Sequence, residues 1–305
     1  MHPARHISSP SGRVSITTIV LVVLLLVCGG VAVYFGCWWA DNRNRLQPPT
    51  PIQVSAKLPG QSQSQPSPTT VPVEKWLDYA GLPRPVGYPN AITVLTNIGY
   101  LSGYDSVRKN PAWVCYHLFQ VTTGTAHPRP AHFFSDPRTG DTVLPEMYSG
   151  SGYDRGHMAP NHAIAVCYGA AAQNETFLMS NIVPQTPALN RHVWERMEEL
   201  EYKQYLLRFH HVWIVTGPVY GAETRRLRNG PVVPTACYKI MLNEAGGSPQ
   251  AQAFIVPQTV SGTEPVAQFV VSVAQVQQTT GLEFFWQLDE PVKTSLRQRM
   301  PKNVW

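Results

Sequence analysis

Charge is scarce in this sequence and is absent from one long stretch. Only 14% of the 305 residues are Asp, Glu, Lys or Arg, and the first forty residues contain no acidic residue. Residues 14–40 carry no charge of either sign. Low charge combined with 10% aromatic residues argues against a disordered chain and for a packed core. The uncharged run exceeds the ~20 residues that a helix needs to cross a bilayer.

A cleaved signal peptide is the main alternative to a membrane anchor, because the run is N-terminal and follows Arg5 and Arg13. Its apolar stretch is longer than the ~7–15 residues of a signal-peptide core, and no small-residue cleavage site closes it. A lipoprotein cleavage box before Cys28 is a third interpretation. We expect a short flank over residues 1–13 and a single-pass N-terminal transmembrane helix over residues 14–40.

A change in composition after residue 40 predicts two further regions. Residues 41–73 are rich in Pro, Gln and Ser and lack the apolar residues of a core, so they predict a linker. Residues 74–305 predict one globular domain. The net charge of +5 is no argument for nucleic-acid binding, since the predicted domain holds 19 basic and 18 acidic residues.

Cysteine provides no framework for the fold. Two cysteines lie in the uncharged run, which leaves Cys115, Cys167 and Cys237 in the predicted domain. Three thiols allow at most one disulfide, and buried free thiols are the favoured interpretation. The sequence has no CxxC pair or Cys/His cluster for zinc, and no zinc finger, RNP motif or basic zipper for base reading.

Short apolar runs bounded by Gly and Pro predict strands over residues 91–95, 113–118, 177–183, 211–216, 237–242 and 253–256. Apolar residues at helical spacing predict a helix over residues 190–208 and, less sharply, a second helix over 266–279. Strands in runs with interspersed helices predict an α+β domain with a plausible antiparallel sheet.

The tetrapeptide Asp154-Arg155-Gly156-His157 is the most informative feature of the chain. Asn190 follows the histidine by 33 positions, and Glu198 comes eight positions later. An imidazole is a base at neutral pH, a guanidinium binds phosphate, and amide and carboxylate oxygens suit a hard metal ion. This set of groups predicts the hydrolysis of phosphodiesters.

Three segments in order, GYDRGHMAP at 152–160, FLMSNIVPQ at 177–185 and LN at 189–190, resemble the DNA/RNA non-specific endonuclease family. That family includes secreted bacterial nucleases and mitochondrial endonuclease G. The resemblance covers roughly residues 80–290 and implies a ββα-metal finger inserted in a mixed, largely antiparallel sheet core with flanking helices. It also implies an endonuclease that cuts DNA and RNA with little sequence preference and leaves 5′-phosphates.

The proposed chemistry centres on three residues. His157 is the expected general base, activating water. Asn190 is the expected direct ligand of Mg²⁺, with Mn²⁺ as the alternative ion; its other interpretation is a helix N-cap. Glu198 lies ~12 Å further along a helix at ~1.5 Å per residue, so we expect it to act through a metal-bound water. Its alternative is a solvated carboxylate on the helix face.

The remaining site residues are expected to bind phosphate or to support the site. Arg155 should contact the phosphate, with a structural ion pair to Asp154 as its alternative. Arg129 resembles a second phosphate-binding arginine of the family; its alternative is a plain surface residue. Asp154 should anchor the local geometry, and Asn181 and Gln185 should brace the site through hydrogen bonds.

Two other functions stay open at this point: a non-catalytic nucleic-acid capture protein on a nuclease scaffold, and a phosphodiesterase acting on small substrates. The expected partners are DNA, RNA and, through residues 14–40, a membrane; a homodimer is also open. A tethered nuclease must be kept from its own genome, so we expect the catalytic domain outside the cytoplasm. The bacterial cell envelope is favoured, with the mitochondrial inner membrane and intermembrane space as the alternative.

Overall fold

The computed structural model describes residues 77–121, 127–140, 143–222, 225–301 and 304–305. The predicted flank, anchor and linker lie outside these residues, and so does the predicted domain boundary at residue 74. Among the helices of the described residues, none is both long and apolar enough to span a membrane. The transmembrane helix therefore stays a prediction.

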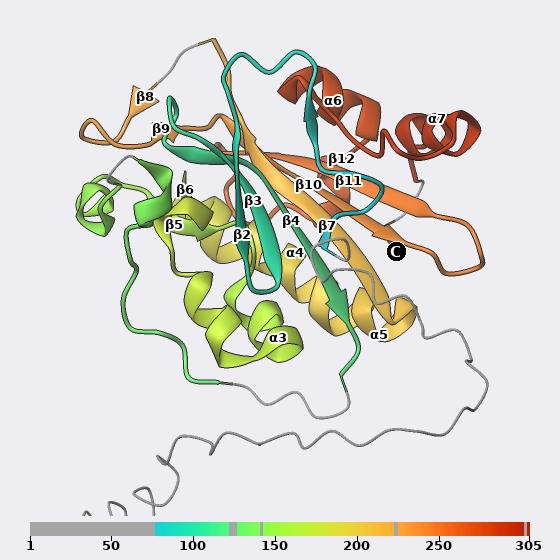
Figure 1. Cartoon of the computed structure of the whole chain (residues 1–305), viewed down its shortest axis with the longest axis horizontal. Helices are drawn as coiled ribbons and strands as arrows, with labels where there is room; N and C mark the ends of the chain where they lie inside the picture. Colours follow the sequence, from blue (N-terminus) through green and yellow to red (C-terminus); the bar gives the residue numbers. More distant parts are fainter. Residues whose placement is uncertain (1–76, 122–126, 141–142, 223–224, 302–303) are drawn as a thin grey trace, which may run out of the picture. The chain divides into compact units, whose positions relative to one another are not determined.

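A seven-stranded sheet forms the centre of the described domain (Figure 1), in the order β12-β11-β10-β7-β4-β3-β2. Every pairing between neighbouring strands in it is antiparallel, which confirms the largely antiparallel core. The strands are β2 (Thr93–Asn97), β3 (Tyr100–Asp105), β4 (Asn110–Phe119), β7 (His211–Val219), β10 (Ala236–Asn243), β11 (Gln250–Pro257) and β12 (Val270–Val271).

Helices cover both faces of this sheet (Figure 1). On one side lie α3 (Asn161–Glu175), α4 (Glu195–Leu200) and α5 (Leu206–Phe209), and on the other α6 (Val273–Thr280) and α7 (Glu290–Gln298). Alternate side chains of β4 serve two separate cores, with Val114 and Tyr116 in one and Trp113 and Cys115 in the other. Because both faces are covered, the central strands are almost continuously apolar in sequence.

The predicted helix over 190–208 is present as one continuous helical run over residues 189–209. It is not α-helical throughout: η4 (Leu189–Trp194) and η5 (Glu201–Tyr205) are π-helical, and α4 and α5 follow them in turn. Such π-helical turns are rare and occur frequently at functional sites. The sequence predicted the extent of the run but not this geometry.

Two predicted elements are wrong in part. The strand expected over 177–183 is a 3₁₀ turn, η3 (Met179–Asn181), followed by β6 (Ile182–Gln185). The helix expected over 266–279 is divided into η6 (Val266–Phe269), strand β12 and α6. Ser272 caps α6 by accepting a hydrogen bond from the backbone of Gln275, so the helix begins later than its apolar pattern suggests.

Helix α3 was not predicted, because its small and apolar residues are spread around the helix instead of forming one stripe. It is kinked at Gly169, where φ is +86°. The three described cysteines are free, as expected. The short remaining elements are β1 (Arg84–Pro85), β8 (Arg225–Arg226), β9 (Val232–Val233), β13 (Leu282–Glu283), η1 (Pro137–Thr139) and η2 (Pro145–Tyr148).

Candidate functional site

The two longest motifs of the sequence pair directly with each other. Strand β5 (Asp154–His157) runs antiparallel to β6, with Asp154 opposite Gln185 and His157 opposite Ile182. A Cβ atom on Gly156 would lie 2.1 Å from Oε1 of Gln185, so only glycine fits there. The helical run 189–209 follows β6, and α3 lies between β5 and β6 in the chain. The ββα finger stays a prediction.

Asn181 braces the exit from β5. Its side chain is fully buried; Oδ1 accepts a hydrogen bond from the backbone of Ala159 at 2.9 Å, and Nδ2 donates to the carbonyls of Ala159 and Thr176 at 3.0 and 2.9 Å. Gln185 is also buried and donates to Sγ of Cys237 at 3.4 Å. Neither residue lines the pocket described below, which fits the bracing role expected for both.

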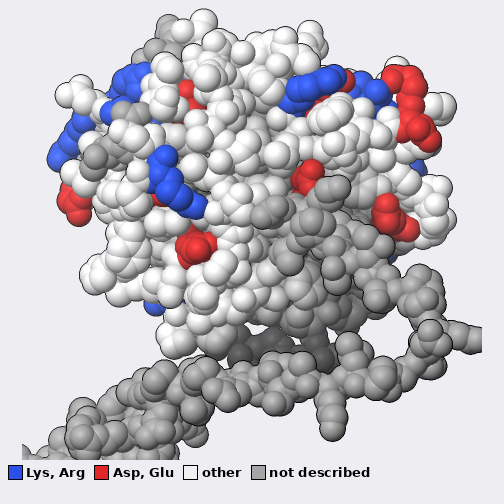
Figure 2. Space-filling view, viewed as in Figure 1, with Lys and Arg blue, Asp and Glu red and all other residues white. Residues whose placement is uncertain are grey.

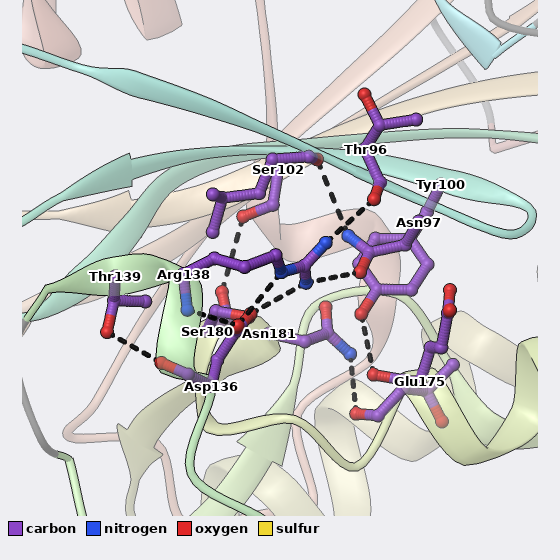
Figure 3. A network of polar contacts seen from close by, with 12 residues as sticks. Thr96, Asn97, Tyr100, Ser102, Asp136, Arg138, Thr139, Glu175, Ser180 and Asn181 are labelled. Carbon is purple, nitrogen blue, oxygen red and sulfur yellow. Dashed lines mark hydrogen bonds and ion pairs between the residues drawn. The ribbon is translucent and has the colours of Figure 1, made fainter.

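A polar network anchors this region to the sheet (Figure 3). Oδ2 of Asp136 accepts hydrogen bonds from Ser180 at 2.6 Å and from Arg138 at 2.7 Å, and Arg138 also donates to Asn97 on β2 at 2.7 Å. Burial acts to raise the pKa of Asp136, but the hydrogen bonds from Arg138 and Ser180 hold it below its ordinary value. No motif in the sequence signals this network.

A pocket of about 580 Å³ opens beside β5 and the helical run. It is lined by five of the eight predicted site residues: Arg129, Arg155, His157, Asn190 and Glu198. These residues come from a loop, a strand and a helix up to 69 positions apart in the chain. The fold therefore gathers the predicted chemical groups around one space.

His157 is the most deeply buried of these groups, at 8% exposure. Its ring lies between Phe133 and Phe177, with centroids 5.4 and 5.0 Å away. Burial, assisted by the positive charge of Arg129, lowers the pKa of His157 to about 3. The imidazole is therefore neutral at physiological pH, and its Nε2 atom has no hydrogen-bond partner among the described residues. A neutral, unpartnered imidazole can accept a proton.

Asp154 connects the tetrapeptide to the helix. Its carboxylate accepts a hydrogen bond from Nδ2 of Asn190 at 3.2 Å and two from Arg191 at 2.8 and 2.7 Å. The hydrogen bonds from Arg191 are the main reason that the pKa of Asp154 lies below its usual range. Because Nδ2 of Asn190 is engaged, the amide oxygen is the atom that remains for a ligand. Asn190 lies inside the helix after Leu189, so it is not the N-cap.

The two arginines keep their charge available. Nε of Arg155 donates to the carbonyl of Pro145 at 3.1 Å, and the guanidinium stacks 5.5 Å from the ring of Phe133. Arg129 is exposed and lies 5.0 Å over the ring of Phe177. Within the described part of the chain neither has a carboxylate partner, and Asp154 pairs with Arg191 instead of Arg155. Both can therefore contact an anionic ligand.

Glu198 is half-buried in the pocket wall and does not stand on a solvated face. Burial raises the pKa of Glu198 to about 8, although the charge of Lys239 acts in the opposite direction. The described residues give its carboxylate no hydrogen bond. The π-helical turn of η4 alters the spacing around the helix, and Asn190 and Glu198 face the same pocket.

A buried ion pair is linked to the pocket through Trp194. Lys239 of β10 and Glu201 of η5 are both fully buried and in contact, and Tyr116 donates to Glu201 at 2.8 Å. Nζ of Lys239 also lies 4.6 Å from the ring of Trp194, whose Nε1 donates to the backbone carbonyl of His157 at 3.2 Å. The one sequence signal for this network is the lysine in the middle of the apolar strand β10.

The donor atoms of the pocket fit a hard divalent cation. The described residues contain no group of three or more His, Cys, Asp and Glu side chains that could hold a metal ion. Mg²⁺ takes oxygen ligands, keeps several waters and needs only one or two protein groups. The amide oxygen of Asn190 and the uncompensated carboxyl of Glu198 supply such groups, and a positive ion would offset the cost of burying the carboxylate.

Charged side chains of both signs are mixed on the face of the molecule in Figure 2, and no broad basic surface covers it. This agrees with the nearly balanced charge expected from the sequence of the domain. On this face, the mixed charges give no broad surface that would attract an anionic polymer.

Comparisons with known proteins give concordant results. A family model described as "DNA/RNA non-specific endonuclease" matches residues 84–290. The mitochondrial nuclease EXOG of Homo sapiens is 34% identical over 205 residues, covering 61% of this chain and 55% of that protein. Mitochondrial Nuclease 1 of Schizosaccharomyces pombe is 31% identical, covering 68% and 69%. The nuclease of Serratia marcescens is 27% identical, covering 73% and 86%.

Among solved structures, the crystal structure of the EndoG/EndoGI complex contains a chain of similar fold. It aligns with a TM-score of 0.57 and 26% sequence identity, covering 73% of this chain and 95% of that one. The chain spans little more than half the length of the vertebrate relatives that it matches, at 58% and 55%.

Proposed function

Because the chain belongs to the DNA/RNA non-specific endonuclease family, we propose that it is a metal-dependent endonuclease that hydrolyses phosphodiester bonds of both DNA and RNA. One observation carries the proposal. The neutral histidine His157 shares one pocket with Arg129, Arg155 and the oxygen donors of Asn190 and Glu198. Among the described residues, Nε2 of His157 has no hydrogen-bond partner and the two arginines have no carboxylate partner. These are the groups that phosphodiester hydrolysis by water requires.

In this proposal His157 takes a proton from the attacking water, since its lowered pKa keeps the imidazole neutral. Oδ1 of Asn190 would hold a divalent cation, Mg²⁺ or Mn²⁺, and Glu198 would act on it through water; the bound ion would supply charge stabilisation to the phosphate oxygens. Arg155 and Arg129 bind the same phosphate. Asp154 accepts a hydrogen bond from Nδ2 of Asn190, so that Oδ1 of Asn190 points away from Asp154.

The nucleophile is an external water, so the reaction needs no 2′-hydroxyl group on the sugar. We therefore expect both DNA and RNA to be cut. The family resemblance implies a 5′-phosphate on the product. A capture protein would bind both polymers without cutting them, and a small-substrate phosphodiesterase would cut neither.

Digestion of plasmid DNA, total RNA and bis(p-nitrophenyl) phosphate by the full-length protein, in Mg²⁺ and in EDTA, separates these three functions. We expect both polymers to be cleaved in Mg²⁺ and neither to be cleaved in EDTA. His157→Ala should lower the rate by ~10²–10⁴-fold, the usual effect of losing a general base, while the exposed His132→Ala should not. A His157→Ala variant that keeps more than about a tenth of the rate contradicts the assignment.

We also propose that residues 14–40 anchor the protein to a membrane, with residues 41–73 as a linker and the catalytic domain outside the cytoplasm. The support is the uncharged apolar run. The vertebrate and fission-yeast relatives are named mitochondrial nucleases, which favours the mitochondrial alternative over the bacterial envelope. The protein should resist carbonate extraction from membranes; soluble protein that begins near residue 41 would contradict this. A homodimer stays a prediction.

A further inference from the structure

The pocket extends beyond the groups that the proposed chemistry uses. One wall is a single face of the helical run, whose residues recur at spacings of three and four: Glu195, Glu198, Glu199, Tyr202 and Lys203. From Asn190 to Lys203 this wall is roughly 20 Å long at ~1.5 Å per residue. A phosphate group is much shorter, so the far end of the pocket has room for a neighbouring part of the substrate.

Two aromatic rings stand at this far end. His162, in the first turn of α3, and Tyr202, in η5, meet edge to face, with centroids 4.7 Å apart and planes at 89°. His162 is exposed, Tyr202 is half-buried, and both line the pocket. In an edge-to-face pair the ring that offers its edge has neither of its faces covered by its partner. An aromatic face that opens into a pocket is a surface on which a planar base can stack.

A polar donor lies beside the rings. Oδ1 of Asn161 accepts a hydrogen bond at 2.8 Å from Nε2 of Gln173, which is itself 2% exposed. This contact fixes the orientation of the amide. Nδ2 of Asn161 has no hydrogen bond to the described residues, and Asn161 lines the pocket. An oriented amide donor next to a stacking surface can contact the acceptor atoms of a base edge.

The charges here favour a neutral group over a second phosphate. Lys203 is paired with Glu199 at 2.5 Å, and Glu195 is a further exposed carboxylate on the same wall. The far end therefore carries no excess positive charge, unlike the end near Arg129 and Arg155. A backbone phosphate would be repelled there, whereas an uncharged base would not.

We propose that His162, Tyr202 and Asn161 form a base-binding subsite, which takes a nucleobase of the bound strand away from the cleaved bond. This inference rests on the proposed nuclease function. A base can stack on a protein ring only when it is unstacked from its own strand, and that costs less in a single strand than in a duplex. The subsite therefore makes the enzyme favour single-stranded over duplex substrates.

The test compares a short labelled oligonucleotide, its duplex, and bis(p-nitrophenyl) phosphate, which has no base, with full-length protein in Mg²⁺. Wild type should cut the single strand faster than the duplex. His162→Ala and Tyr202→Ala should each lower kcat/KM about tenfold more for the single strand than for the small substrate, mainly through KM. Tyr202→Phe, which keeps the ring, should restore the wild-type ratio.

Gln204→Ala, an exposed neighbour on the same helical run and outside the pocket, is the matched control. Fluorescence anisotropy of the oligonucleotide in EDTA measures binding without cleavage, so the subsite is tested even if the wild type cuts nothing and the proposed function fails. His162 is exposed, so its variant tests the subsite even if Tyr202→Ala does not fold. Equal losses on all substrates, with unchanged anisotropy, would mean that the rings make a packing contact only.

Discussion

The polar groups that line the pocket differ from the buried polar groups outside it in how completely the protein satisfies them. Nε2 of His157 has no partner, and Glu198 and Arg129 have no hydrogen bond among the described residues. By contrast, Asn181 uses its amide oxygen and nitrogen in three hydrogen bonds, and Lys239 lies in contact with Glu201. Unsatisfied buried groups cost stability, whereas completed networks fix one arrangement. We therefore expect His157 and Glu198 to serve the chemistry, and Asn181, Lys239 and Glu201 to support the fold.

The largest expected effect on stability comes from breaking the buried ion pair between Lys239 and Glu201. Lys239→Met leaves Glu201 buried without its partner and should lower the free energy of unfolding by about 3–5 kcal/mol. Replacing both residues, as Lys239→Met with Glu201→Leu, should recover most of that loss because no unpaired charge remains. Urea denaturation measures both variants. Equal destabilisation of the single and double variants would show that the charge is not the cause.

The Mg²⁺ requirement tests the roles proposed for the pocket residues Asn190 and Glu198. Asn190→Ala should raise the Mg²⁺ concentration needed for half-maximal activity more than Glu198→Ala does, because a direct ligand matters more than one acting through water. Loss of an indirect contact of this kind typically costs ~10–100-fold in metal affinity or activity. The exposed Gln204→Ala, on the same helical run and outside the pocket, is the control. A larger effect for Glu198→Ala would reverse the two roles.

Removing the side chain of Asn181 at the end of β5 should lower stability. Asn181→Ala leaves the backbone groups of Ala159 and Thr176 without partners and should cost about 1–3 kcal/mol. Asn174→Ala, an exposed asparagine on the preceding helix, should change the urea midpoint little. If both variants unfold at the same urea concentration, the hydrogen bonds of Asn181 do not brace the site.

Acid should reveal the cost of burying His157. Its pKa is lowered to about 3 in the fold, below the ordinary value of about 6.5, so the unfolded chain binds the extra proton between these pH values. Stability conferred by the neutral ring is complete above pH ~6.5 and is lost as pH falls towards ~3. In EDTA, His157→Ala should lose about 1 kcal/mol less than wild type between pH 6 and 5. His132→Ala should show the same pH dependence of the free energy of unfolding as wild type. If His157→Ala also shows it, the lowered pKa of His157 is contradicted.

Sequence reasoning located the groups that carry the chemistry because they sit in short contiguous motifs, such as Asp154 to His157. It also located the central strands, since their aliphatic runs are buried on both faces. It could not find the hydrogen bond from Asn190 to Asp154 or the pairing of Lys239 with Glu201, because these contacts join distant segments. The π-helical turn at Leu189–Trp194 was also hidden, since apolar spacing does not distinguish it from an α-helix.

The contrast between pocket residues and supporting residues is tested most directly by one variant, His157→Ala. Its cleavage rate and its unfolding midpoint are measured together. The account predicts a rate lower by ~10²–10⁴-fold on plasmid DNA, with an unfolding midpoint at pH 5 equal to or above that of wild type. Such a result would show a buried group retained for reactivity at the expense of stability. A variant that unfolds more easily while its folded fraction cleaves at the wild-type rate would contradict it, placing His157 with the supporting residues.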